Sequence, residues 1–289
     1  MPRFAVSQAA AHELLPACRL LFAARAEHSR DRLLSDRDAS GLFVACGGGR
    51  LCGAALVQVL PGALGVAYPP RGEPVEAADA VTAAACEWLR ARGVKVCQAF
   101  AAAEERPEMA PLERAGFRHV TQLAMLQRDF WPTDPLPRAA EPLSFVAHAP
   151  PFAGDFAQTL LATHEATLDC PELNAPRTPG ELRAGFATSG GEAYLAWEGG
   201  GPVGVVMFEP GAEPGAAELT YLGVVPAARG RGLGAELLKF AVAEASLARG
   251  AVLNVSVDVR NTPAMKLYLG HGFREYDRRE VWLATWPRA

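Results

Sequence analysis

The sequence lacks any apolar run long enough to cross a bilayer as a helix, which takes about 20 consecutive residues. Its first residues, Met1-Pro2-Arg3-Phe4, do not follow the basic, apolar and small-residue order of a secretion signal. It also lacks an excess of basic residues: 28 Lys and Arg face 32 Asp and Glu, for a net charge of −4. That balance gives no general attraction to nucleic acid or anionic membranes. We therefore expect a cytoplasmic protein that binds neither.

Cysteine motifs for metals or disulfide frameworks are missing as well. The six cysteines, at positions 18, 46, 52, 86, 97 and 170, form no Cys-x-x-Cys motif and have no pair of histidines nearby. We therefore expect no metal site. Cys46 and Cys52 flank a triple-glycine turn, so a bridge across a hairpin is one interpretation. Two small residues packed on neighbouring strands is the interpretation we favour.

The chain repeats one pattern of elements. Residues 42–57 and 193–208 each contain an apolar strand, a triple-glycine turn and a second apolar strand, which predicts two β-hairpins. Residues 114–118 and 270–274 each contain a helix-ending glycine followed by an aromatic residue that begins a strand. The offset between the copies is nearly constant, and 289 residues suffice for two domains with separate cores. We expect two tandem domains.

A proline-rich segment separates the two copies. Residues 130–138 contain three prolines, which do not fit inside a helix or a central strand, so the segment is interpreted as a semi-rigid linker. We place the boundary at residue 135, with a first domain over 1–135 and a second over 136–289. The predicted fold class is α/β, of the α+β type, with a mixed sheet in each domain.

The most informative stretch is a glycine-rich loop with the sequence Val225-Pro226-Ala227-Ala228-Arg229-Gly230-Arg231-Gly232-Leu233-Gly234. It follows a strand predicted over 217–225 and opens a helix predicted over 233–248. Backbone N–H groups at such a helix start are unpaired and lie at the positive end of the helix dipole, so they bind phosphate readily. Glycines let a ligand approach the backbone, and the arginines add attraction. The Gly-Lys-Ser/Thr ending of a Walker loop and the last glycine of the Rossmann pattern are both missing.

Two motifs resemble the GNAT superfamily of N-acetyltransferases. The loop matches that family's acyl-CoA pyrophosphate loop, with the pattern Val-x-Pro-x-x-Arg-Gly-x-Gly-x-Gly. Residues 261–273, a short helix with proline in its first turn and a glycine at its end, match a second family motif. The order of elements in the second half is also that of a GNAT domain. Residues 218–226 are similar to tandem GNAT chains with a weak first half, such as mycothiol synthase and its relatives.

The resemblance implies that acetyl-CoA binds to the second half as a cosubstrate. Its pyrophosphate would lie on the amides of residues 229–234, and its pantetheine arm along a strand end that splays from its neighbour. The resemblance assigns nine positions to this ligand: Val224, Val225, Arg229, Gly230, Arg231, Gly232, Leu233, Gly234 and Asn261. Asn261 also suits the cap of the helix that follows it.

The resemblance also implies two catalytic roles. Glu218 matches the position of a glutamate that takes a proton from the amine; a solvated carboxylate at a strand end is the alternative. Tyr268 matches a tyrosine that protonates the departing CoA thiolate; an aromatic core residue is the alternative. Tyr221 follows Glu218 by three positions, so strict alternation places it on the opposite face of the strand, and we predict no catalytic role for it.

Residues 168–176, between the first two predicted helices of the second half, are the candidate acceptor loop. Asp169 and Glu172 in this loop would hold a cationic amine, or else cap helices in solvent. The histidines, including His164 and His271, are interpreted as surface or packing residues.

The first half departs from the loop motif. Its strand over 63–68 is followed by residues 69–76, where one glycine stands in place of three, prolines remove amide donors, and Glu73 and Glu76 would repel a pyrophosphate. Its closing helix carries no counterpart of Tyr268. We therefore expect a degenerate copy that has lost CoA. It would form one wall of the acceptor cleft or cover a sheet edge.

Two functions of different classes follow from these motifs. The first is an acetyl-CoA-dependent N-acetyltransferase that acts on the primary amine of a small molecule. The second is a non-catalytic regulatory module that binds acyl-CoA. Because two tandem domains within one chain can reproduce the contacts of a dimer, we favour a monomer over a homodimer.

Overall fold

The computed structural model describes residues 4–22, 39–130, 143–186, 191–211, 213–247 and 251–286. The chain forms two compact units, of which unit 1 comprises residues 1–120 and 279–289 and unit 2 comprises residues 121–278. This division differs from the continuous one predicted at residue 135, because each unit takes one strand from the far end of the other repeat. The predicted linker over 130–138 lies, after residue 130, outside the described residues.

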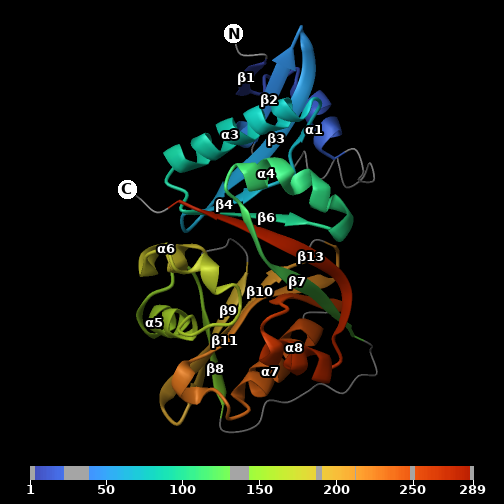
Figure 1. Ribbon diagram of the computed structural model, residues 1–289. Coiled ribbons are helices and arrows are strands. Elements are labelled where there is room, and N and C mark those ends of the chain that lie inside the picture. Colours follow the sequence, from blue (N-terminus) through green and yellow to red (C-terminus); the bar gives the residue numbers. More distant parts are fainter. Residues whose placement is uncertain are drawn as a thin grey trace. The chain divides into compact units, whose positions relative to one another are not determined.

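Unit 1 is a mixed sheet with helices on both faces (Figure 1). Its strands lie in the order β1 (Ala5–Gln8), β2 (Leu42–Gly47), β3 (Arg50–Leu60), β4 (Leu64–Ala67), β6 (Val96–Ala101) and β13 (Arg274–Thr285). Helix α1 (Leu14–Leu21) packs on one face. Helices α3 (Val75–Ala91) and α4 (Ala110–Arg114) pack on the other.

Unit 2 repeats this plan. Its strands lie in the order β8 (Ser144–His148), β9 (Glu192–Glu198), β10 (Gly201–Pro210), β11 (Ala216–Val224), β12 (Val252–Asp258) and β7 (Arg118–Asp129). Helix α5 (Gly154–Thr163), followed by α6 (Pro179–Ala184), covers one face, and α7 (Leu233–Leu247) and α8 (Thr262–Gly270) cover the other (Figure 1).

The two repeats exchange their last strands. In unit 1, β6 is paired antiparallel with residues 280–285 of β13, which follows the second repeat in sequence. In unit 2, β12 is paired antiparallel with residues 123–129 of β7, which follows the first repeat. Each unit therefore needs chain from both repeats to complete its sheet.

The predicted fold class is confirmed. Both triple-glycine segments form hairpins, β2–β3 and β9–β10, and each unit has a mixed α/β sheet. The amphipathic helix expected over 152–167 is shorter, because the chain turns at residues 164–166 and Ala166 has a positive φ of 48°. Helix α6 begins after Thr178, whose side chain accepts a hydrogen bond from the Glu181 amide.

The two faces of the unit 2 sheet have separate cores. Leu219 on β11 packs with Leu237 and Leu238 of α7, whereas Met207 on β10 packs with Phe156 of α5. These two cores fix the orientation of β11, the strand that leads into the glycine loop.

Three further observations concern the described part of the chain. No helix in it has both the length and the apolar character needed to cross a bilayer. The six cysteines are free thiols. No group of three or more His, Cys, Asp or Glu side chains is arranged there to hold a metal ion.

Candidate functional site

A pocket of about 230 Å³ opens where β11 and β12 separate. The parallel ladder between these strands has three pairs and ends at Glu218 opposite Asn254. Beyond that point both strands line the pocket, β11 with residues 219–224 and β12 with residues 255–257. The expected splay of the strand is therefore present.

The backbone of β11 presents free hydrogen-bonding groups to this gap. In an antiparallel pair, successive residues direct their N–H and C=O groups to alternate edges of the strand. The Val225 N–H donates to the Val203 carbonyl on β10 at 3.0 Å, so the backbone groups of Leu222 and Val224 face the gap. The Val224 carbonyl accepts a hydrogen bond from Arg229 Nε at 3.0 Å. An extended ligand can therefore pair with Leu222 and with the Val224 amide.

The glycine loop continues directly from this strand end. Gly230 and Gly232 have φ values of +75° and +84°, which side chains rarely adopt, and a Cβ on either would point into open space. Within the described structure, the N–H groups of Gly230, Arg231, Gly232 and Leu233 have no hydrogen-bond acceptor. They lie at the start of α7, where the helix dipole is positive. The loop is therefore built to bind an anion.

The two arginine side chains of the loop have partners within the protein. The Arg229 guanidinium donates to the carbonyls of Val224, Ala166 and Thr163, and so ties the end of α5 to the end of β11. Arg231 forms an ion pair with both carboxylate oxygens of Glu198, at 2.8 and 2.9 Å. These contacts fix the position of both arginines beside the unpaired amides of the loop.

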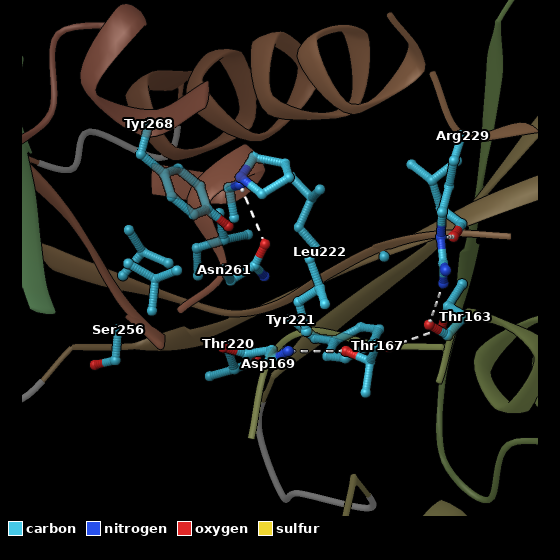
Figure 2. Close-up of a pocket in the computed structure, with 18 of the residues that line it drawn as sticks. Thr163, Thr167, Asp169, Thr220, Tyr221, Leu222, Arg229, Ser256, Asn261 and Tyr268 are labelled. Atoms are coloured by element: carbon cyan, nitrogen blue, oxygen red, sulfur yellow. Dashed lines mark hydrogen bonds between the residues drawn. The ribbon is translucent and has the colours of Figure 1, made fainter. Parts of the chain in front are cut away.

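Helix α8 contributes Tyr268 to the opposite side of the pocket, and the residue that caps its start contributes Asn261 (Figure 2). Tyr268 is buried and packs edge-on against Phe273, with ring centroids 5.5 Å apart. Burial, and next the Asp169 carboxylate, raises the pKa of Tyr268, so its hydroxyl stays protonated at neutral pH. Asn261 caps α8 by accepting a hydrogen bond from the Ala264 amide at 3.3 Å. Asn261 therefore caps α8 and lines the pocket at the same time.

Glu218 lies at the end of the paired region and outside the set of residues that line the pocket. It is half-buried and directly opposite Glu209 on β10. Burial, and next the Glu209 charge, raises the pKa of Glu218. The carboxylate is suited to accept a proton, but its position does not bring it to the pocket wall.

The prediction that Tyr221 faces away from Glu218 is wrong. Met207 pairs with Tyr221 and Phe208 with Leu219, so Thr220 forms a β-bulge. The extra residue shifts the alternation by one position and places Tyr221 on the Glu218 face. Tyr221 lines the pocket in consequence.

Tyr221 belongs to an aromatic cluster under α5. Its hydroxyl is 2.7 Å from Thr163 Oγ1 and 3.3 Å from His164 Nδ1, and its ring stacks on His164 with centroids 5.2 Å apart. Burial lowers the pKa of His164 and raises that of Tyr221 to about 12, so both are neutral near pH 7. His164 is a packing residue here, as expected. Nothing in the sequence pattern indicates the bulge, so the sequence could not identify Tyr221 as a pocket residue.

The candidate acceptor loop is tied to the end of β12. Asp169 Oδ1 accepts the Asp258 N–H at 3.0 Å, and Asp258 Oδ2 accepts the Cys170 N–H at 3.0 Å. Glu172 pairs with both terminal nitrogens of Arg260, at 2.7 and 2.9 Å. Of the two predicted acceptor carboxylates, only Asp169 lines the pocket. The Glu172 charge is balanced by Arg260.

In unit 1 the corresponding segment forms no loop of free amides. After β4, residues 71–72 return to β3 as strand β5 (Arg71–Gly72), and the amides of Tyr68 and Glu73 donate to the Leu56 and Cys52 carbonyls. Strand β4 also stays paired with β6 over its full length, from Leu64 to Ala67. The splayed gap and the anion loop of unit 2 therefore both lack a counterpart among the described residues of unit 1.

Residues 160–273 match the model of the acetyltransferase (GNAT) family. This range spans the end of α5, the splayed strands, the glycine loop and α8. No curated protein sequence matches the chain.

Solved structures extend the likeness to both units. A GCN5-related N-acetyltransferase from Sphaerobacter thermophilus is similar over 99% of this chain and 96% of its own, with 18% identity and a TM-score of 0.64. A tandem GNAT protein from the clavulanic acid biosynthesis pathway is similar over 99% of both chains, with 19% identity and a TM-score of 0.58. A fungal β-N-acetylglucosaminidase with a GCN5-related glucosamine N-acetyltransferase region is similar over 97% of this chain and 38% of its own. The identity is 13% and the TM-score is 0.63. These likenesses show a tandem GNAT fold.

Proposed function

We propose that the chain is an acetyl-CoA-dependent N-acetyltransferase that acetylates a primary amine of a small molecule at unit 2. The observation that supports this proposal most directly is that a strand end beside a pocket leads without a break into a loop of unpaired amides. The splayed end of β11 faces a pocket, and the loop that follows it has four unpaired amides at the start of α7. The family match over residues 160–273 supports the same conclusion.

The residues of the loop and the strand suit the parts of acetyl-CoA. The amides of residues 230–233 would hold the pyrophosphate, and the Leu222 and Val224 backbone groups would pair with the pantetheine arm. An N–H of this strand at the thioester oxygen would stabilise the negative charge that develops during attack. Arg229 and Arg231 hold the loop in place, and their positive charges lie beside the amides that would receive the pyrophosphate.

Tyr268 is the proposed acid that protonates the CoA sulfur. It lines the pocket, and its buried hydroxyl is protonated at neutral pH. Glu218 is the base that the resemblance predicts, and its raised pKa suits that role. Because Glu218 does not line the pocket, a proton would reach it only through intervening water.

The chemistry of the pocket favours a cationic acceptor. Among the described residues that line it, the charged side chains are Asp169 and Arg229, and the Arg229 guanidinium already donates to three carbonyls. The Arg229 charge is directed at these carbonyls, whereas the Asp169 carboxylate can accept a hydrogen bond from a ligand, so the lining offers an ammonium group a charged partner. The similarity of residues 218–226 to mycothiol synthases stays a hypothesis drawn from sequence and does not identify the acceptor.

Calorimetric titration with acetyl-CoA is the test of the cofactor site. We expect one site per chain, because the unit 1 segment pairs its amides with β3. Two sites would overturn the assignment of unit 1 as a copy without CoA. No binding up to about millimolar concentration would overturn the enzyme proposal. Binding without thiol release in a broad amine screen would instead favour the regulatory module.

Replacing Tyr268 by phenylalanine is expected to lower kcat about tenfold to a hundredfold. The change removes the proton donor and keeps the ring that packs against Phe273. Acetyl-CoA affinity should stay the same, which calorimetry checks alongside thiol-release kinetics. An unchanged kcat under conditions where chemistry limits the rate would remove Tyr268 from the mechanism.

A further inference from the structure

Asp169 lies on the segment that follows α5 and lines the same pocket as Tyr268 (Figure 2). The pocket leaves it accessible to solvent, while protein atoms surround it closely. Among the described residues that line the pocket, Asp169 is the one carboxylate, and so the one charged group that can accept a hydrogen bond from a cationic ligand. An electrostatic role toward the acceptor therefore falls to this carboxylate.

One oxygen of Asp169 orients the carboxylate and the other is open. Oδ1 accepts the Asp258 N–H at 3.0 Å, and the Asp169 N–H donates to Thr167 Oγ1 at 3.1 Å. Oδ2 has no hydrogen-bond partner in the described structure. The backbone of the segment is held at the next residue, where the Cys170 N–H donates to Asp258. A carboxylate fixed by one oxygen has its second oxygen ready to receive a proton.

We propose that Asp169, rather than Glu218, binds the ammonium group of the acceptor and takes its proton. This inference rests on the proposed N-acetyltransferase function. It assigns proton transfer to the carboxylate that lines the pocket, whereas Glu218 lies beyond the pocket lining and opposite another glutamate.

The proton transfers balance as follows. Asp169 Oδ2 takes one proton from the ammonium group, which frees the nitrogen lone pair. The nitrogen attacks the thioester carbon, the C–N bond forms and the C–S bond breaks. The sulfur takes the Tyr268 hydroxyl proton, and the second proton of the nitrogen restores that hydroxyl. The products are the amide, the free thiol and one proton that Asp169 releases to solvent.

The surroundings of Asp169 raise its affinity for a proton above that of an ordinary aspartate. Burial raises its pKa most; the Asp258 N–H bond and the Arg260 charge lower it, and the Asp258 charge raises it, for a net rise. The other titratable groups that face it are Cys170, Tyr221 and Tyr268, which are neutral near pH 7. A base with a raised pKa is closer to the optimum for proton transfer than an ordinary aspartate.

The test replaces Asp169 with asparagine. The amide oxygen can still accept the Asp258 N–H, so the segment keeps its anchor and only the charge is lost. Thiol release is measured with acetyl-CoA and four probe amines: ethanolamine, putrescine, tyramine and glucosamine. We expect kcat/KM for the best probe to fall about 100-fold or more, with unchanged acetyl-CoA affinity by calorimetry. In the parent, kcat/KM should fall as the pH drops through the raised pKa of Asp169, which gives the pH profile of kcat/KM an acidic limb. The Asp169→Asn variant should lack this limb.

One matched carboxylate serves as the control, and Glu218 is tested beside it as the rival base. Glu172→Gln changes a carboxylate of the same segment that pairs with Arg260, and it should stay within about threefold of the parent rate and keep the acidic limb. Glu218→Gln changes the base predicted by resemblance and should keep the acidic limb, because the limb is assigned to Asp169. Asp169→Glu, which restores a carboxylate, should recover part of the rate and the limb, and so separates a chemical role from a folding defect.

The outcomes separate the two proposals. If Asp169→Asn keeps the parent rate and the acidic limb, or if Glu218→Gln is the variant that loses them, Asp169 is not the base. If the parent binds acetyl-CoA but releases no thiol with any probe, the acetyltransferase proposal fails, and the Asp169 inference fails with it.

Discussion

The Gly232→Asp variant is expected to lose acetyl-CoA binding, with an affinity at least about 100-fold weaker than that of the parent. Gly232 has a φ of +84° and lies between residues whose amides are unpaired. The new carboxylate would extend into the open space where the pyrophosphate approaches, and it would repel that anion. Calorimetric titration of both proteins measures the loss.

Gly49→Asp is the matched control for this prediction. Gly49 lies in the β2–β3 turn of unit 1, has a φ of +77° and also faces open space. The Gly49→Asp variant therefore has the same kind of backbone strain and the same added charge, but far from the glycine loop in sequence. Its affinity for acetyl-CoA should equal that of the parent. Equal losses in both variants would trace the effect to strain. If Gly232→Asp bound acetyl-CoA as tightly as the parent, the loop would not be the pyrophosphate site.

The Asp258→Ala variant is expected to lose about 2–4 kcal/mol of unfolding free energy. The Asp258 side chain has no exposed surface and accepts hydrogen bonds from Thr121 Oγ1, the Cys170 amide and the Arg260 side chain. Truncation leaves the Thr121 hydroxyl and the Cys170 amide without this acceptor, and Arg260 keeps Glu172 as its carboxylate partner. Urea unfolding, with acetyl-CoA affinity as a check on the fold, measures the change.

Glu275→Ala is the control for an exposed ion pair. Glu275 pairs with Arg278 on β13, and removing such a pair should change the unfolding free energy by about 0.5 kcal/mol or less. A loss below about 1 kcal/mol in Asp258→Ala would contradict the role of Asp258 as the anchor of the acceptor segment.

Acid unfolding provides a second readout of the same anchor. Burial alone raises the pKa of Asp258, but hydrogen bonds from Arg260, Thr121 and Cys170 outweigh it and lower the pKa to about 2. A folded-state pKa below the unfolded value stabilises the protein above that unfolded value. This contribution is lost as pH falls from about 4 to about 2. The Asp258→Asn variant should lack that part of the acid transition.

The features that the sequence predicted well depend on neighbouring residues. The glycine loop and its helix start, the capped helix after Asn261 and the two hairpins each follow from the backbone preferences of a few consecutive residues. Because both repeats carry the triple-glycine hairpin and the helix-ending glycine, the tandem mixed-sheet fold could be expected as well.

The partners of the site residues could not be predicted in this way. Nothing local shows that Thr220 bulges, so alternation placed Tyr221 on the wrong face. The anchoring of Asp169 by the Asp258 amide joins residues far apart in sequence. Likewise, the three carbonyls that bind the Arg229 guanidinium come from two separate elements.

The sequence by itself determined where an anion can bind and what local elements each repeat forms, because glycine, proline and capping residues act over one or two turns of chain. Only the tertiary structure decided which strand completes each sheet. Strands β7 and β13 follow the equivalent helices α4 and α8 and pair antiparallel with the equivalent strands β12 and β6, so their local patterns do not distinguish the two pairings. The prolines and glutamates of unit 1 already predicted that its segment lacks an anion loop. The tertiary structure decided what takes its place, because the pairing of this segment with β3 depends on contacts between strands that are not neighbours in sequence.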